Sequence, residues 1–128
     1  ECGQTCPIIF IGTDCVTMSN ELLNNASRDA ARGHAHICPA DDGGYVALAL
    51  PTACPQSVFH QVEWSTSNTC DSQTNAISRA GLTCRQGPKL GDVDEEQDYI
   101  DLTAQLQQHA PLRLLCPRVS RLLLPDVQ

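Results

Sequence analysis

Apolar and polar positions at the start of the chain predict a strand followed by a helix. Residues 7–12 (PIIFIG) form a short apolar run between turn residues, which indicates a buried strand. Thr17 or Ser19 can cap the helix that follows, and Gly33 ends it. Between them one face is apolar at helical spacing, through Met18, Leu22, Leu23, Ala26 and Ala30.

The middle of the chain predicts two strands and a short helix. Residues 41–44 (DDGG) indicate a turn, and residues 45–50 (YVALAL) a strand that stops at Pro51. Residues 58–66 (VFHQVEWST) alternate as a half-buried strand does, so we expect it to pair antiparallel with the strand before it. Asp71 or Ser72 can cap a helix that Gly81 closes.

The last third predicts a loop at residues 85–92, a third helix and a final strand. The acidic stretch 92–98 suits the first turn of that helix, because its carboxylates face the positive end of the helix dipole. Pro111 stops the helix, and residues 112–116 form the strand. The order resembles a βαββαβ unit with one extra helix, which predicts an α+β fold with an antiparallel sheet and helices on one face. We expect one domain over residues 1–128, with residues 117–128 as a C-terminal docking tail.

The chain has eight cysteines in 128 residues, so we also expect covalent cross-links. No two of them form a short Cys-x-x-Cys pair, and an even, dispersed set predicts four disulfides made in an oxidising compartment. Aromatic residues are scarce, so these bridges would support a modest core. The pairing stays open for Cys2, Cys6, Cys15, Cys38, Cys54, Cys70, Cys84 and Cys116.

Charge and terminal residues point to a secreted protein that does not bind nucleic acid. The net charge of −7 disfavours a broad basic surface. No apolar run approaches the length of a membrane span. The Glu1-Cys2 start resembles a mature form after removal of a leader, and Asn25 begins an Asn-Ala-Ser sequon for glycosylation.

Two segments offer metal ligands, but neither predicts a metal site. His34 and His36 share one side of an extended segment and could bind zinc or copper, yet a disulfide would remove Cys38 as a ligand. The acids at 92–98 could bind calcium, but Gln97 and Thr103 stand where an EF-hand loop needs Gly and Glu. We therefore expect no metal and no cofactor.

The C-terminal segment is apolar and locally basic in an acidic protein. It is predicted to dock on the core, and the alternative is an interaction surface for a protein or cell-surface target, or for a membrane. The oligomeric state stays open. The residues of this surface would be Arg113, Arg118, Arg121, Leu122, Leu123 and Leu124.

His60, Glu63 and Arg85 are the residue types that cleave RNA by acid–base chemistry. The spacing Cys2…Cys6…Cys15, followed by residues 19–26 (SNELLNNA), resembles the start of small fungal guanyl-specific ribonucleases. The Tyr-Pro-His-x-Tyr segment of that family is missing. No nucleophile elbow, phosphate-binding glycine loop or HExxH segment is present, so we predict no catalytic residues.

In size, cysteine use and βαββαβ order the chain resembles the small secreted killer toxins and effectors of fungi. The resemblance implies a virulence-type toxin that binds a host or competitor cell and is not an enzyme. A small secreted, ribonuclease-like hydrolase is the first alternative. The second is a subunit of an extracellular or viral-surface complex that uses residues 117–128 as its interface.

Overall fold

The computed structural model describes residues 6–124, which form a mixed α+β fold. Within these residues four strands, two α-helices and one 3-10 helix come first, and three α-helices follow. The strands are β1 (Ile8–Ile11), β2 (Ala35–Pro39), β3 (Tyr45–Leu50) and β4 (Cys84–Gln86). The helices are α1 (Asn20–Ala31), the 3-10 helix η1 (Gln56–Phe59), α2 (Thr69–Arg79), α3 (Glu96–Gln108), α4 (Ala110–Leu115) and α5 (Pro117–Leu123).

The sheet has the strand order β1-β3-β2-β4 and is mixed, not antiparallel throughout as predicted. Strand β3 pairs antiparallel with both β1 and β2, whereas β2 and β4 pair in parallel. Strands β1, β2 and β4 therefore all run in one direction. Their carboxyl ends lie at the same edge of the sheet, which is where open α/β sheets bind ligands.

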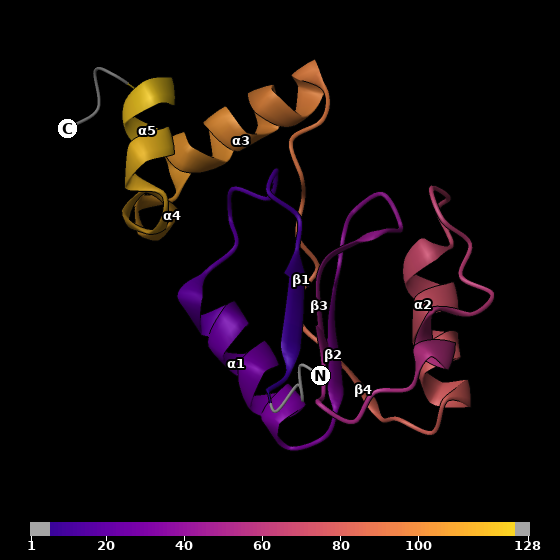
Figure 1. Ribbon diagram of the computed structural model, residues 1–128. Coiled ribbons are helices and arrows are strands. Elements are labelled where there is room, and N and C mark those ends of the chain that lie inside the picture. Colours follow the sequence, from indigo (N-terminus) through magenta and orange to yellow (C-terminus); the bar gives the residue numbers. More distant parts are fainter. Residues whose placement is uncertain (1–5, 125–128) are drawn as a thin grey trace.

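Helices cover both faces of the sheet, so the expectation of helices on one face is wrong (Figure 1). On one face α1 buries Ala26 and Ala30 against Ala49. On the other face Ile77 of α2 packs with Ile37 and Leu48. The inner strands β2 and β3 are buried along almost their whole length. Because such strands are apolar on both sides, each face needs a covering layer.

Local sequence signals placed the first two helices correctly. The Ser19 side chain accepts a hydrogen bond from the Leu22 backbone N–H at 3.1 Å, as expected of an N-cap. Helix α2 begins at Thr69, two residues before the predicted cap at Asp71. Gly33 and Gly81 follow the two helices at φ +87°, the left-handed conformation that glycine adopts without strain.

Three predicted strands are corrected by the structure. Residues 58–66 form the end of η1 and an irregular loop, and residues 112–116 lie mainly in α4. Strand β1 does exist, but it lies at a sheet edge with Phe10 and Ile11 about half exposed, so it is not buried. The second antiparallel neighbour of β3 is instead β2, in a segment for which no strand is predicted above.

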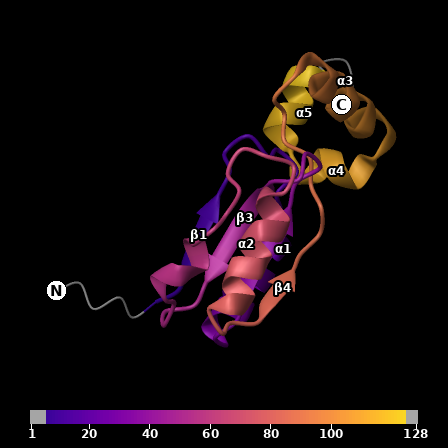
Figure 2. The same cartoon turned by 90° about the vertical axis from the view of Figure 1, so that its right-hand side faces the viewer.

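The three C-terminal helices form a group beside the end of the sheet (Figure 2). Leu102, Leu106 and Leu124 make its buried centre, and Val16 from the β1–α1 loop packs against them. The Cys116 thiol also donates to the Val16 carbonyl oxygen at 3.0 Å. Within residues 6–124, no helix combines the length and the apolar character that a membrane span needs.

The seven cysteines that the structure describes are free thiols, which contradicts the predicted disulfide framework. Cys15 and Cys38 share one core cluster, and Cys54 and Cys84 pack against the cluster that contains Cys70. Cys116 contacts Val16, and Cys6 is exposed. Burial raises the pKa of Cys38 to about 11, which keeps that thiol protonated. The four buried cysteines, Cys15, Cys38, Cys70 and Cys116, act as small apolar core residues. Cys2 lies outside the described residues.

Alkylation in denaturant without reductant is expected to add at least seven labels per chain. Each free thiol reacts once it is exposed, whereas a disulfide sulfur does not. Intact mass spectrometry counts the labels, and the same reaction in native buffer is the control. Native Cys38 should resist labelling, because it is buried and its pKa is raised. An unlabelled mass in denaturant would restore the disulfide framework.

Candidate functional site

Acidic side chains follow the carboxyl ends of all three parallel strands. Asp14 comes after β1, Asp41 and Asp42 come after β2, and Asp92 and Asp94 come after β4. Since these strand ends share one edge of the sheet, the three loops that carry the acids meet there. The site is thus assembled by the topology from segments that are distant in the sequence.

Backbone hydrogen bonds hold the three loops in place. The N–H of Val93 donates to the Asp14 carbonyl oxygen at 3.2 Å and so joins the first loop to the third. The N–H of Asp41 donates to the Leu90 carbonyl oxygen at 3.1 Å, which joins the second loop to the third. The loops that carry the acids are therefore held together by main-chain contacts.

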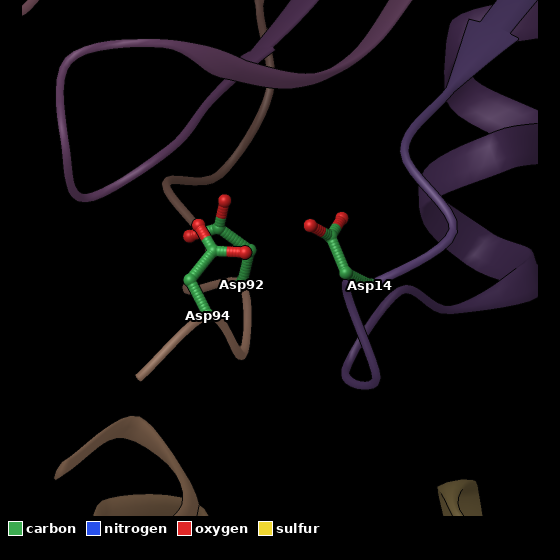
Figure 3. Close-up of side chains that lie close together, drawn as sticks. All are labelled: Asp14, Asp92 and Asp94. Atoms are coloured by element: carbon green, nitrogen blue, oxygen red, sulfur yellow. The ribbon is translucent and has the colours of Figure 1, made fainter. Parts of the chain in front are cut away.

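Three carboxylates converge at this edge (Figure 3). One oxygen each from Asp14, Asp92 and Asp94 lies within 4.8 Å of the others. Repulsion from Asp92 raises the pKa of Asp94, with smaller contributions from partial desolvation and from Asp14. Carboxylates this close together repel each other when they are ionised, and a bound cation would relieve that repulsion. Their oxygens are the donors that suit a hard divalent cation such as Mg²⁺, Mn²⁺ or Ca²⁺.

The cluster opens into a strongly acidic cavity of ≈ 310 Å³. Asp98 also belongs to it, and its carboxylate accepts hydrogen bonds from the N–H groups of Asp94 and Glu95 at 3.1 and 3.0 Å. Part of the acidic run thus caps α3, as predicted, and part of it faces the cavity. The cavity is lined by Asp41, Asp42, Gly91, Asp92, Asp94, Glu95 and Asp98.

The histidines that we considered as metal ligands lie in and beside β2. His36 is buried, and its Nδ1 lies 2.7 Å from an Asp29 carboxylate oxygen of α1. His36 Nε2 is also buried and has no hydrogen-bond partner among residues 6–124. The geometry therefore assigns the proton to Nδ1, which donates to Asp29. His34, His36 and Cys38 do not form a converging ligand group in the described part of the chain.

Replacing Asp29 by Asn is expected to cost about 1–2 kcal/mol of stability at neutral pH, because His36 loses its charged acceptor. The hydrogen bond from His36 holds the pKa of Asp29 below its usual 3.8. A lowered acid pKa stabilises the fold above the unfolded-state value, and this stability is lost as the pH falls through the folded value. The gap between wild type and Asp29→Asn should therefore begin to narrow near pH 3.8 and close as the pH falls further, through the lowered folded value.

Urea unfolding at several pH values measures this gap. Glu21→Gln is a matched control, since Glu21 is an exposed acid on the same helix. A gap that stays constant well below pH 3.8 would show that the pKa of the Asp29 carboxyl does not depend on His36.

The residues of the ribonuclease alternative do not form a common site. His60 and Glu63 are exposed in the loop after η1, and Glu63 is held there by its backbone groups. Arg85 lies on β4, and its Nε is 3.8 Å from the Asp29 carboxylate of α1. It therefore lies on the α1 face of the sheet. Acid–base cleavage by these three residues therefore has no geometric support.

The other predicted surface residues remain predictions. Asn25 is exposed on α1, as a glycosylation site requires. In the C-terminal segment Leu122 is 80% exposed, whereas Leu124 is buried in the helical group. Arg121 donates to the Pro117 carbonyl oxygen at 3.2 Å, and Arg118 is exposed. None of these residues lines the acidic cavity.

Sequence reasoning missed Asp14 as a site residue, although a signal was present. Each parallel strand is followed within a few residues by an aspartate. That pattern becomes visible only once residues 35–39 and 84–86 are recognised as strands, and residues 85–86 were wrongly predicted to belong to a loop. The histidines and the cysteine of the first of these strands concealed it.

One solved structure resembles the chain closely in fold. It comes from Desulfovibrio desulfuricans G20 and is described as a candidate nucleotide-diphospho-sugar transferase. The TM-score is 0.75 at 24% identity, which shows a common fold. The match covers 94% of this chain and 54% of that one, so the chain spans about half the length of the solved protein. Among curated proteins, none matches.

A protein-family profile matches residues 1–66, just over half of the chain. Its description is "Uncharacterized protein conserved in bacteria (DUF2064)". This bacterial family and the transferase-like fold overturn the resemblance to fungal killer toxins and effectors, and with it the expectation of a non-enzymatic toxin. The expected secretion, which rested on the disulfides, the Glu1-Cys2 start and the Asn25 sequon, stays a prediction. The chain belongs to the DUF2064 family.

Proposed function

We propose that this protein takes part in the cation-dependent transfer of a sugar from a nucleotide-diphospho-sugar donor. The observation that carries the proposal is the convergence of Asp14, Asp92 and Asp94 within 4.8 Å at the carboxyl edge of the parallel strands. The fold shared with the Desulfovibrio protein supports it. Because the chain spans about half of that protein, the activity of a complete enzyme is part of the proposal.

Charge explains why such a donor would need a cation at this site. A diphosphate carries negative charge, and the cavity is lined by six acidic side chains. Without a counter-ion these groups would repel each other strongly, since like charges at short range oppose binding. A bound Mg²⁺ or Mn²⁺ would neutralise the diphosphate of the donor and of the nucleoside diphosphate that leaves.

The residues of the cluster have distinct parts in this proposal. Asp14, Asp92 and Asp94 would supply the carboxylate oxygens that hold the cation. Such sites commonly use one or two carboxylates together with substrate phosphates. Asp41 and Asp42 line the same cavity on the β2–β3 turn, and Asp41 would orient the polar groups of the donor sugar. In the transfer, the oxygen of an acceptor hydroxyl replaces the diphosphate oxygen on the anomeric carbon.

Thermal unfolding and a donor assay test the proposal together. Mn²⁺ or Mg²⁺ in excess is expected to raise Tm, since a ligand at 100 times its Kd adds about 2.7 kcal/mol to the stability. A panel of nucleotide-diphospho-sugars should release nucleoside diphosphate only when the cation is present. EDTA should remove both effects. A cation that leaves Tm unchanged and a panel without turnover would reject the proposal.

A further inference from the structure

A second cavity lies on the other side of the β2–β3 turn and is bounded by the loop before α2. Its volume is ≈ 530 Å³. Asp42 lines both this cavity and the acidic one, so the two adjoin at that side chain. Its lining residues are Asp42, Gly44, Tyr45, Trp64, Ser65, Thr66, Ser67 and Thr69.

Trp64 is presented at this cavity with 54% of its surface exposed. An exposed indole offers a large apolar face on which a ligand can pack. Its neighbour Ser65 has φ +58°, a left-handed conformation that a non-glycine residue seldom adopts. Such outliers concentrate where a loop must hold one particular shape.

Hydrogen bonds fix the loop that carries Trp64. The Glu63 carbonyl oxygen accepts from the hydroxyls of Thr66 and Thr69 at 3.0 and 2.6 Å. The Glu63 N–H donates to the Ser72 hydroxyl oxygen at 2.9 Å. The backbone beside Trp64 is therefore fixed before any ligand binds, which reduces the entropy that the loop loses on binding.

The loop is also fastened to the turn that carries Asp42. The Cys70 N–H donates to the Gly43 carbonyl oxygen at 2.9 Å. A side chain at Gly43 would overlap the Ser67 carbonyl group, so the two segments touch through their backbones. Trp64 and Asp42 consequently face the same cavity from two rigidly joined segments.

The lining chemistry fits a neutral ligand with many hydroxyl groups. Within residues 6–124 the cavity is lined by one carboxylate, aromatic rings and hydroxyls, and by no Lys, Arg or His. No hydrogen bond from the described part of the chain occupies the hydroxyls of Ser65 and Ser67. A carboxylate accepts from sugar hydroxyls and repels anions, and an indole packs on the apolar C–H face of a sugar ring.

We propose that this cavity binds the acceptor, a neutral sugar or polyol, with its ring on Trp64 and a hydroxyl on Asp42. The inference rests on the proposed transfer function, because the acidic cavity across Asp42 would hold the donor. The arrangement would place an acceptor hydroxyl beside the donor's anomeric carbon. Specificity for the acceptor would then reside in the Trp64 loop.

Tryptophan fluorescence tests the inference directly, because Trp64 is the only tryptophan in the chain. Glucose, N-acetylglucosamine and glucose 6-phosphate serve as probes, with and without EDTA. We expect at least one neutral sugar to change the Trp64 emission saturably in both buffers. Glucose 6-phosphate should bind about tenfold more weakly than glucose, through repulsion by Asp42. Unchanged emission with every probe would overturn the inference.

Variants then locate the binding by saturation-transfer NMR, which needs no tryptophan. Trp64→Ala should lose the sugar signal. Tyr99→Ala should keep it, because Tyr99 is a similarly exposed aromatic that lines neither cavity. Loss in both variants, or in neither, would contradict the assignment. Asp92→Asn should retain sugar binding while losing cation binding, so failure at the donor site and failure at this cavity give different results.

Discussion

Replacing Asp92 by Asn is expected to lower cation-dependent turnover by about a hundredfold or more and to remove the cation-induced rise in Tm. Removing a carboxylate ligand commonly costs this much, because the site loses both a donor and a negative charge. Asp92 also provides the largest contribution to the raised pKa of Asp94. The pKa of Asp94 should therefore fall toward its usual value in the variant.

The same substitution is expected to leave the metal-free protein at least as stable as wild type. A raised acid pKa means that repulsion destabilises the fold at neutral pH and that this loss is relieved as the pH falls. Activity and metal-free stability should thus change in opposite directions. A simple folding defect would lower both, and that outcome would contradict a role for Asp92 in cation binding.

Glu21→Gln provides the matched control for charge. Glu21 is an exposed acid in the first turn of α1 and lines neither cavity. Its replacement should leave turnover and the cation-induced shift of Tm unchanged. Isothermal titration with Mn²⁺ measures both variants, and equal affinity in Asp92→Asn and wild type would rule out the cluster as the cation site.

Local signals predicted those parts of the fold that local physics determines. The cap at Ser19, the glycines after α1 and α2, and the apolar run of β3 act within a few residues. Strand β2 could not be found in this way, because His36 and Cys38 look polar or reactive in isolation. They are tolerated at the centre of the sheet only because Asp29 and the α1 layer surround them.

The site was harder to predict than the fold because it depends on strand order. Asp14 and Asp92 are distant in the sequence, and only the placement of β1, β2 and β4 in one direction brings their loops together. The segment 58–66 is a second case in which contacts outside the local pattern decide the structure. Its alternating pattern suits a strand, yet hydrogen bonds to Thr66, Thr69 and Ser72 hold it as a loop.

The cysteines misled the interpretation for a physical reason. A cysteine looks the same in a sequence whether it is a buried thiol or part of a disulfide. Only the distance between two cysteines in the folded chain distinguishes the two cases. Cys38 and Cys70 lie on opposite faces of the sheet, packed with α1 and α2 respectively. Apolar packing of these thiols accounts for their burial without any bridge.

Replacing Gly43 by Ala is expected to destabilise the fold by about 2–4 kcal/mol. Gly43 has φ +92°, and an added Cβ would overlap the Ser67 carbonyl group, which is backbone and cannot rotate away. Gly33→Ala is the matched control, because Gly33 has φ +87° with no atom within 4 Å of an added Cβ. Backbone strain alone should cost the control about 1 kcal/mol.

The difference between the two variants isolates the contact that joins the β2–β3 turn to the Trp64 loop. Urea unfolding measures both, and equal losses would show that this contact carries no stability. In Gly43→Ala the loop must move away from Asp42, so the Trp64 emission of the folded variant should also change, while that of Gly33→Ala should not. A folded Gly43→Ala with wild-type emission would mean that Trp64 is positioned independently of the turn.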